Sequence, residues 1–220
     1  MLALRHATRR YGDRVAIDDI SLDVRAGERV ALVGPSGAGK TTLLRVMSET
    51  LRRTLPGRDI GFIDQSLALA DALRVVHNVN AGRLGHWSSP RALVSLIAPL
   101  ERDRAGAALS RLGIGEMIDA PTGQLSGGQR QRVAIARVLV QDPKVILADE
   151  PVSQLDPERA RSVLALLGDR TLIVSLHRPE LATEFCDRVV GLQAGRVLFD
   201  CAARDVIPEM LSRLYASAPP

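Results

Sequence analysis

The residues best suited to do chemistry form a glycine-rich loop that ends in a lysine and a threonine. The loop fits the pattern G-x-x-x-x-G-K-[ST] and consists of Gly34, Pro35, Ser36, Gly37, Ala38, Gly39, Lys40 and Thr41, followed by Thr42. Glycines let backbone N–H groups turn toward phosphate oxygens, and a helix behind the loop adds its positive dipole end. Lys40 would neutralise the β- and γ-phosphates of a nucleotide, and Thr41 would bind Mg²⁺. The alternative is an ordinary turn before a helix, with Lys40 in solvent.

Two consecutive carboxylates, Asp149 and Glu150, follow the apolar segment 145–148. Open α/β sheets place their ligands at the C-terminal ends of strands. Because successive side chains of a strand point to opposite faces, both carboxylates can serve one site only if the strand ends there. Asp149 would bind Mg²⁺, directly or through water, and Glu150 would polarise the attacking water, which is worth roughly 10²–10⁴-fold in rate. The alternative for Glu150 is a cap on the next element before Pro151.

A third motif has the residues Leu125, Ser126, Gly127, Gly128 and Gln129. Ser126 and Gln129 form a capping box that opens a helix. Gly127 and Gly128 then occupy the first helical positions, although each glycine weakens a helix by about 1 kcal/mol relative to alanine. Such a start leaves backbone N–H groups open to an anion. Two anion sites for one nucleotide are explained if two copies of the chain face each other head to tail.

The elements that must position these motifs alternate between strand and helix, except in the middle of the chain. Hydrophobic patterns predict strands at 2–9, 29–33, 60–63, 145–148, 171–175, 188–192 and 196–199, and helices at 39–47, 157–167 and 178–185. Segments 21–24 and 29–33 flank a turn and suggest a hairpin. The middle predicts only helices, at 72–82, 90–99, 101–112 and 126–140. We therefore expect a parallel α/β core with a helical lobe. The end, 216–220, is expected to fray.

Composition excludes several classes of protein. The 220 residues are 46% hydrophobic and 25% charged, as in an ordinary globular domain. No apolar stretch reaches the 18 residues of a membrane span, and the N-terminus does not resemble a signal peptide. Two cysteines, Cys186 and Cys201, do not make a disulfide framework, which favours a reduced cytoplasmic compartment.

The basic residues are unusual in type. Only two of the 29 are lysines, Lys40 and Lys144. The net charge is +4, the arginines are scattered, and aromatic residues make up 3%. These features argue against a nucleic-acid partner. Lys40 lies in the glycine-rich loop, whereas Lys144 is expected at the surface.

The three motifs, in the chain order 34–41 (Walker A), 125–129 (LSGGQ) and 149–150, resemble those of the ATPase subunits of ABC transporters, and LSGGQ is the discriminating one. The resemblance covers nearly the whole chain. It implies one domain, 1–220, with a P-loop NTPase core and a shortened antiparallel β subdomain at about 1–70 and 140–220, and a helical subdomain at about 72–140. It also implies a head-to-tail homodimer, or a heterodimer with a related ATPase. Two ATP molecules would be bound in the dimer, each between the glycine-rich loop (Walker A) of one copy and the LSGGQ segment of the other.

The resemblance assigns roles to further residues. Tyr11 would stack on adenine, with ordinary strand packing as the alternative. Gln65 would contact Mg²⁺ and the attacking water and sense the permease, with simple loop exposure as the alternative. His177 would contact the γ-phosphate, although a lone histidine is usually structural. Asp156 belongs to a D-loop, 153–156, and could instead only cap the helix that starts at Pro157.

Segments outside these motifs look like the ATPase of phosphonate importers, namely 80–87, 176–177 and 186–192. This likeness implies ATP-driven uptake of a phosphonate or a related phosphorus compound, through a separate membrane permease and with a periplasmic or extracellular solute-binding protein. The subunit would sit at the cytoplasmic face of the inner membrane. The alternatives are an ABC ATPase accessory to phosphonate metabolism, and a regulatory module that holds ATP without hydrolysing it.

The chain departs from the family between Lys40 and Gln65. Family members usually have a longer stretch here, with extra strands of the antiparallel subdomain. This sequence offers only residues 48–58 and no strand–turn–strand pattern, so the β subdomain should be small. Gln154 and Asp64 are also unusual choices, for which the sequence suggests no physical reason.

Overall fold

Six strands form the central sheet, in the order β4-β5-β6-β3-β7-β8. The structure is a computed structural model that describes residues 2–216. The strands are β3 (Arg29–Val33), β4 (Ile60–Ile63), β5 (Val145–Asp149), β6 (Thr171–Ser175), β7 (Arg188–Gln193) and β8 (Arg196–Ala202). All neighbours pair in parallel except β7 and β8, which are antiparallel. The predicted parallel α/β core is therefore confirmed.

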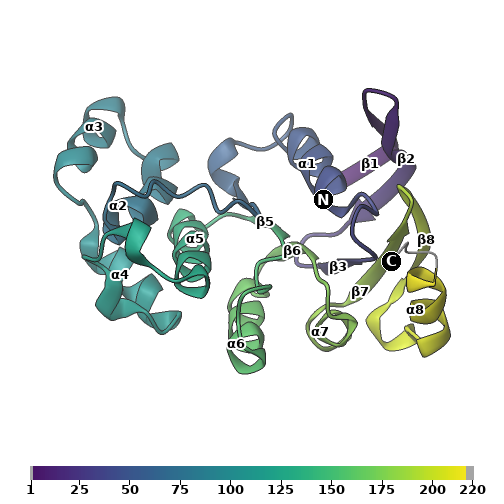
Figure 1. The fold of residues 1–220 in the computed structure, drawn as a ribbon. Coiled ribbons are helices and arrows are strands. Elements are labelled where there is room, and N and C mark those ends of the chain that lie inside the picture. Colours follow the sequence, from purple (N-terminus) through teal and green to yellow (C-terminus); the bar gives the residue numbers. More distant parts are fainter. Residues whose placement is uncertain (1, 217–220) are drawn as a thin grey trace.

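Two hydrophobic cores lie on opposite faces of this sheet. Val30 and Leu32 of β3 belong to the core that contains α1 (Lys40–Leu51). Their neighbours on the strand belong to the other core, with α6 (Pro157–Leu167) and α7 (Pro179–Phe185). Figure 1 shows α1 above the sheet and α6 and α7 below it. Because β3 is covered on both faces, its sequence is apolar almost throughout.

The middle of the chain forms a helical lobe beside the sheet, on the left in Figure 1. Its helices are α2 (Val75–Asn80), α3 (Ser89–Ile97), α4 (Arg102–Arg111) and α5 (Gly127–Gln141). In the described chain, no strand lies between β4 and β5. Helix α5 contacts α2 and α4 within the lobe and also β4 of the sheet. It therefore connects the lobe to the core. No helix among residues 2–216 has the length and apolar character needed to cross a membrane.

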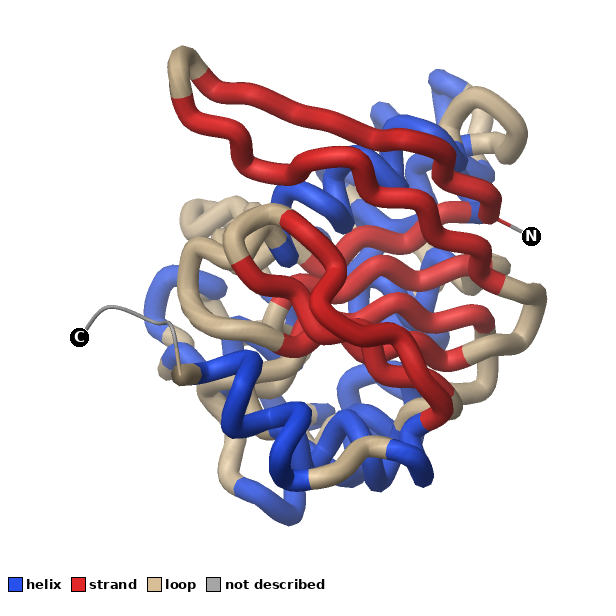
Figure 2. Tube along the Cα trace, turned by 90° about the vertical axis from the view of Figure 1, so that its right-hand side faces the viewer, coloured by secondary structure: helices blue, strands red, loops and turns tan. Residues whose placement is uncertain are grey.

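The first two strands form a separate antiparallel sheet. Strands β1 (Leu2–Tyr11) and β2 (Arg14–Val24) pair with each other, and Figure 2 shows this hairpin apart from the main sheet. The expected hairpin between 21–24 and 29–33 is therefore wrong. Strand β2 alternates between buried and exposed residues and pairs with β1, whereas β3 is buried on both faces and belongs at the centre of the parallel sheet.

The antiparallel sheet contains only these two strands, because α1 is followed by a single short turn of helix, Gly57–Asp59, and then by β4. The expectation of a small β subdomain is thus confirmed. A helix near the end of the chain, α8 (Pro208–Tyr215), was not expected from the sequence. The expected fraying concerns residues 216–220, of which 217–220 lie outside the described residues.

Candidate functional site

A cavity of 490 Å³ lies at the C-terminal ends of the central strands. It is lined by Tyr11, Arg14, Ala16, the loop residues 36–42, Gln65, Glu150 and His177. Five segments that are far apart in sequence thus meet in one place. The structure brings together most of the residues that the sequence suggested, at the edge where open α/β sheets bind ligands.

The glycine-rich loop can follow its path only because two positions lack a side chain. A Cβ atom on Gly34 would lie 2.1 Å from the carbonyl oxygen of Leu192, and one on Gly39 would lie 2.5 Å from that of Ala16. Both glycines also have positive φ angles, 148° and 105°. Gly39 is the N-cap of α1, so the loop leads directly into the positive end of a helix. Neighbouring backbone therefore encloses the loop on two sides.

Lys40 is folded along the inside of this loop. Its Nζ donates hydrogen bonds to the carbonyl oxygens of Gly34 at 2.7 Å and Pro35 at 3.0 Å, and the residue is 6% exposed. Burial lowers the pKa of the Lys40 ammonium, while the nearby charges of Glu150 and Asp149 act in the opposite direction. The lysine is thus a nearly buried cation, held only by neutral carbonyl groups, at the base of the cavity.

The two carboxylates leave β5 in different directions. Asp149 is the last residue of the strand, and Glu150 has a φ of 52°, so the strand ends between them. Ser175 at the end of β6 connects them: its Oγ donates to Oδ1 of Asp149 at 2.6 Å and accepts from the backbone N–H of Glu150 at 2.9 Å. Glu150 Oε1 lies 2.5 Å from His177 Nε2. The sequence analysis required the strand to end at this pair if both carboxylates were to serve one site, and the strand does end there.

Several oxygen atoms in or beside the cavity are suited to hold Mg²⁺, although Asp149 itself is not among the residues that line the cavity and only its neighbour Glu150 is. Oδ2 of Asp149 is buried and has no hydrogen-bond partner. The hydroxyl of Thr41 and the amide oxygen of Gln65 belong to residues that line the cavity. No group of three or more His, Cys, Asp or Glu side chains in the described chain could hold a metal alone. Mg²⁺ prefers oxygen ligands and is usually held by one or two carboxylates together with phosphates and water, which this set allows.

The loop after Gln65 is held by an arginine that sequence reasoning missed. Arg137 of α5 donates Nη1 to the carbonyl oxygen of Ala68 and Nη2 to that of Leu67, both at 2.7 Å. Leu67 and Ala68 have φ angles of 60° and 45°, which side-chain-bearing residues rarely adopt. Burial lowers the pKa of the Arg137 guanidinium. The sequence feature that could have indicated this role is the position of the arginine, between Ala136 and Val138 on a largely buried helix.

We expect Arg137→Met to lower the free energy of unfolding by about 1–3 kcal/mol, because the carbonyl oxygen of the buried residue Leu67 loses its donor, whereas that of the exposed residue Ala68 can bind water instead. ATP affinity should change little, since Arg137 does not line the cavity. Urea denaturation and nucleotide titration test the two statements. Arg111→Met, at an exposed position on α4, is the control. An unfolding free energy equal to that of the wild type would contradict the assigned role.

The LSGGQ segment forms the start of α5, as the capping box predicts. The N–H of Gln129 donates to Ser126 Oγ at 3.3 Å, and Gln129 Oε1 accepts from the N–H of Ser126 at 2.8 Å. A Cβ atom on Gly127 would lie 2.2 Å from Oε1 of Gln154. The unusual glutamine of the D-loop thus packs against Gly127, so a contact within the chain is one reason for that glycine. None of the residues 126–129 lines the cavity.

Asp156 caps a helix, which was the alternative role that the sequence suggested for it. It is the N-cap of α6, and its Oδ1 accepts from the N–H of Arg159 at 3.0 Å. It does not line the cavity. Gln131, which sequence reasoning also missed, is buried and donates Nε2 to the carbonyl oxygen of Glu150 at 2.9 Å, while its Oε1 accepts from the N–H of Gln154 at 3.1 Å. Helix α5 therefore holds both Glu150 and the D-loop.

Comparison with known proteins gives consistent results. Residues 17–153 match the model of a family described as ABC transporter. The phosphonates import ATP-binding protein PhnC of Pseudomonas entomophila is 41% identical, over 98% of this chain and 92% of its own length. A PhnC of Pseudomonas aeruginosa is 46% identical, over 92% and 85%. The first of these alignments spans 242 positions, more than the 220 residues of this chain, so that relative carries residues that this chain lacks.

Solved structures are also similar. The dimeric structure of a bacterial ABC transporter cassette superposes with a TM-score of 0.80 and 28% identity, covering 94% of this chain and 100% of the other. A dimeric ATP-binding cassette in a post-hydrolysis state, bound to ADP and Pi, superposes with a TM-score of 0.76 and 27% identity over the same shares. The similarity therefore extends over both the core and the helical lobe.

Proposed function

This chain belongs to the ABC transporter family of ATPases, and we propose that it drives the import of a phosphonate or a related phosphorus compound. As an ABC ATPase it binds and hydrolyses ATP. The observation that supports the substrate class is the 41–46% identity, over nearly the whole chain, to proteins named as phosphonates import subunits. The geometry of the site supports ATP hydrolysis, because Lys40, Glu150 and His177 all line one cavity.

Most of the residues that line the cavity have a role in this proposal. Lys40 and the backbone N–H groups of residues 37–42 bind the phosphates, and Tyr11 stacks on adenine. Thr41, Gln65 and Asp149 would hold Mg²⁺, which when bound would neutralise phosphate charge. Glu150 accepts a proton from the attacking water.

His177, within hydrogen-bonding distance of Glu150, contacts the γ-phosphate. Catalysis then consists mainly of positioning and electrostatic stabilisation.

The LSGGQ residues act on a second copy in this proposal. Ser126, Gly127, Gly128 and Gln129 lie outside the cavity of their own chain, yet they leave an open helix N-terminus suited to an anion. A head-to-tail dimer, of two copies or with a related ATPase, would place them on the partner's γ-phosphate. The D-loop with Asp156 would lie at the same interface. A solved cassette that is dimeric and 28% identical supports this arrangement.

The remaining partners are a membrane permease and a solute-binding protein outside the membrane. The permease would dock beside the Gln65 loop and the helical lobe, with the ATPase at the cytoplasmic face of the inner membrane. A groove of 450 Å³ next to that loop supports the location, since residues of both the core and the lobe line it, among them Phe62, Ala68, Gly82 and Arg137.

The decisive experiment is uptake of a phosphonate by cells that lack their own importer ATPase. Such cells, given this chain with its permease and binding protein, should grow on methylphosphonate as the only phosphorus source. The Glu150→Gln chain is the matched control and should not support growth. ATP hydrolysis without growth, together with co-purification with soluble enzymes, would instead indicate an accessory role in phosphonate metabolism. Absence of phosphate release would indicate a regulatory module.

A further inference from the structure

A second cation, Arg14, lines the same cavity as Lys40. Arg14 is the first residue of β2, and its Nη2 lies 3.5 Å from the carbonyl oxygen of Gly37 in the phosphate-binding loop. That contact is too long to satisfy the guanidinium. In the part of the chain that the structure describes, Arg14 makes no ion pair, whereas many other arginines do, for example Arg188 with Asp200. Arg14 is therefore a cation without an anion at the edge of a nucleotide site.

The position of Arg14 is set by the backbone of the hairpin. Arg14 and Ala16 of β2 both line the cavity. Ala16 lies at an irregularity of the β1–β2 pairing, between Val15, which pairs with Arg10, and Ile17, which pairs with Arg9. The carbonyl of Ala16 lies so close to Gly39 that no side chain fits between them. Across the hairpin, Arg14 pairs in register with Tyr11. The strand that carries Arg14 thus packs directly on the phosphate-binding loop.

The charges of the site leave a task for this arginine. Within one chain the two carboxylates, Asp149 and Glu150, offset most of the positive charge of Lys40 and a bound Mg²⁺, so the polyphosphate of ATP would still lie in an excess of negative charge. An arginine fork can form two parallel hydrogen bonds with a phosphate group. Tyr11 marks the proposed adenine end and Lys40 the β- and γ-phosphate end. Arg14 pairs with Tyr11 across the hairpin, and its guanidinium reaches the carbonyl oxygen of Gly37. The α-phosphate is the anionic group between those two ends.

We propose that Arg14 is a nucleotide-binding residue whose guanidinium binds the α-phosphate of ATP. This inference rests on the proposed ATP site and adds a contact to it. Because both ATP and ADP carry the α-phosphate, the arginine contributes equally to the binding of either nucleotide. It does not distinguish the state before hydrolysis from the state after it.

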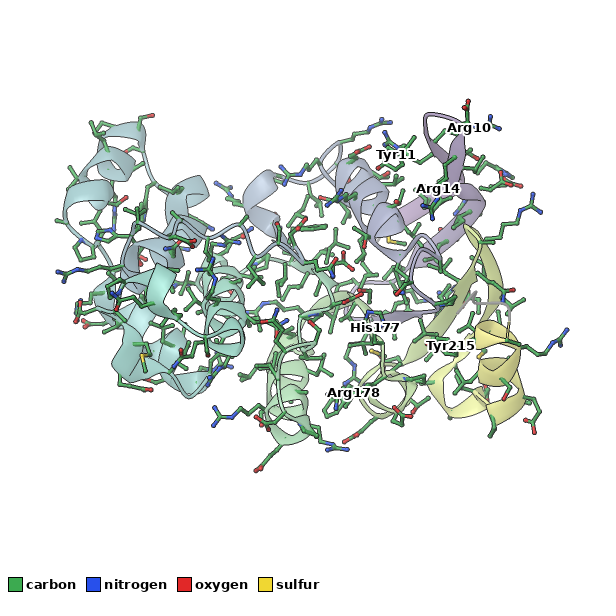
Figure 3. All side chains as sticks on the ribbon, viewed as in Figure 1. Arg10, Tyr11, Arg14, His177, Arg178 and Tyr215 are labelled. Atoms are coloured by element: carbon green, nitrogen blue, oxygen red, sulfur yellow. The ribbon has the colours of Figure 1, made fainter. Side chains whose placement is uncertain are left out.

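Titration of ATP and ADP into the purified chain and its Arg14→Gln variant tests the inference. Loss of a charge-assisted pair should weaken both nucleotides by the same factor, about 10- to 100-fold. Arg10→Gln is the matched control: Arg10 lies on the same hairpin, carries the same charge and does not line the cavity. In Figure 3, Arg10 lies toward the outer end of the hairpin and Arg14 nearer to His177. The control should bind within about twofold of the wild type.

Three results would overturn the assignment while leaving the ATP site intact. The first is an unchanged affinity of Arg14→Gln for both nucleotides. The second is an equal loss of affinity in Arg10→Gln, which would indicate a general effect of charge. The third is a loss of affinity for ATP but not for ADP in Arg14→Gln, which would place the arginine at the γ-phosphate. Failure of the wild-type chain to bind either nucleotide would overturn the proposed function, and this inference with it. Arg14→Lys, which keeps the charge but not the fork, should fall between wild type and Arg14→Gln.

Discussion

Glu150→Gln should stop turnover while ATP binding remains. The amide has the size of the carboxylate but cannot accept a proton from water, so the rate of hydrolysis should fall by about 10²–10⁴-fold. The backbone contacts of Glu150 do not depend on its side chain: its N–H donates to Ser175, and its carbonyl oxygen accepts from Gln131. The site should therefore keep its shape. Because ATP persists between two copies, the variant should also accumulate as a dimer.

Phosphate release and size-exclusion chromatography with ATP measure the two effects. Glu209→Gln, at an exposed position on α8, is the control for loss of one negative charge and should hydrolyse ATP at the wild-type rate. Hydrolysis by Glu150→Gln near the wild-type rate would show that another group activates the water. Loss of ATP binding would show that the carboxylate supports the site structurally.

The motifs were predictable from the sequence because their chemistry is local. A glycine-rich loop needs glycines at fixed spacing, and Ser126 and Gln129 cap their own helix. Partners of strands are not local, and this explains the wrong hairpin. Residues 21–24 and 29–33 are close in sequence and separated by a turn, but β3 pairs with β6 and β7, which come more than a hundred residues later. Burial on both faces of β3 was the better guide.

The residues that hold the site in place were harder to find than those that line it. Gln131 and Arg137 lie on α5, and their partners are backbone groups of Glu150 and of the loop after Gln65. Every residue has a backbone carbonyl group, so no sequence pattern identifies which carbonyl group accepts a hydrogen bond from a given side chain. Both residues belong to the helix that LSGGQ opens. Movement of that helix, when a second copy binds at its N-terminus, would therefore reach Glu150 and the loop after Gln65.

This arrangement also gives Gln154 a physical role that the sequence did not suggest. Its side chain packs against Gly127 at the start of α5, and its N–H donates to Gln131 of the same helix. The D-loop and the LSGGQ segment thus form one surface within each chain. An alanine at position 154 would open space beside Gly127, and the surface offered to a second copy would change without any change in the cavity.

Lys40→Ala should weaken ATP binding by about 100-fold or more, a larger loss than substitution of any other residue that lines the cavity should cause. A nearly buried hydrogen bond to a charged group is worth up to about 3 kcal/mol, and this ammonium would meet two phosphates. Glu150 and Asp149 would remain, without the ammonium that offsets part of their charge. Titration with ATP measures the loss. Affinity equal to that of the wild type would show that the loop does not bind phosphate.

Lys40→Arg tests whether charge alone is sufficient. The chain uses arginine at every other basic position except Lys144, whose exposed ammonium pairs with Asp59 at 2.9 Å. Lys40 instead lies within a loop whose carbonyls, at Gly34 and Pro35, already contact a compact ammonium at 2.7 and 3.0 Å. A planar guanidinium is broader and cannot occupy that space. We therefore expect Lys40→Arg to bind ATP almost as weakly as Lys40→Ala, whereas Lys144→Arg should bind normally. Wild-type affinity in Lys40→Arg would mean that the loop needs only a positive charge.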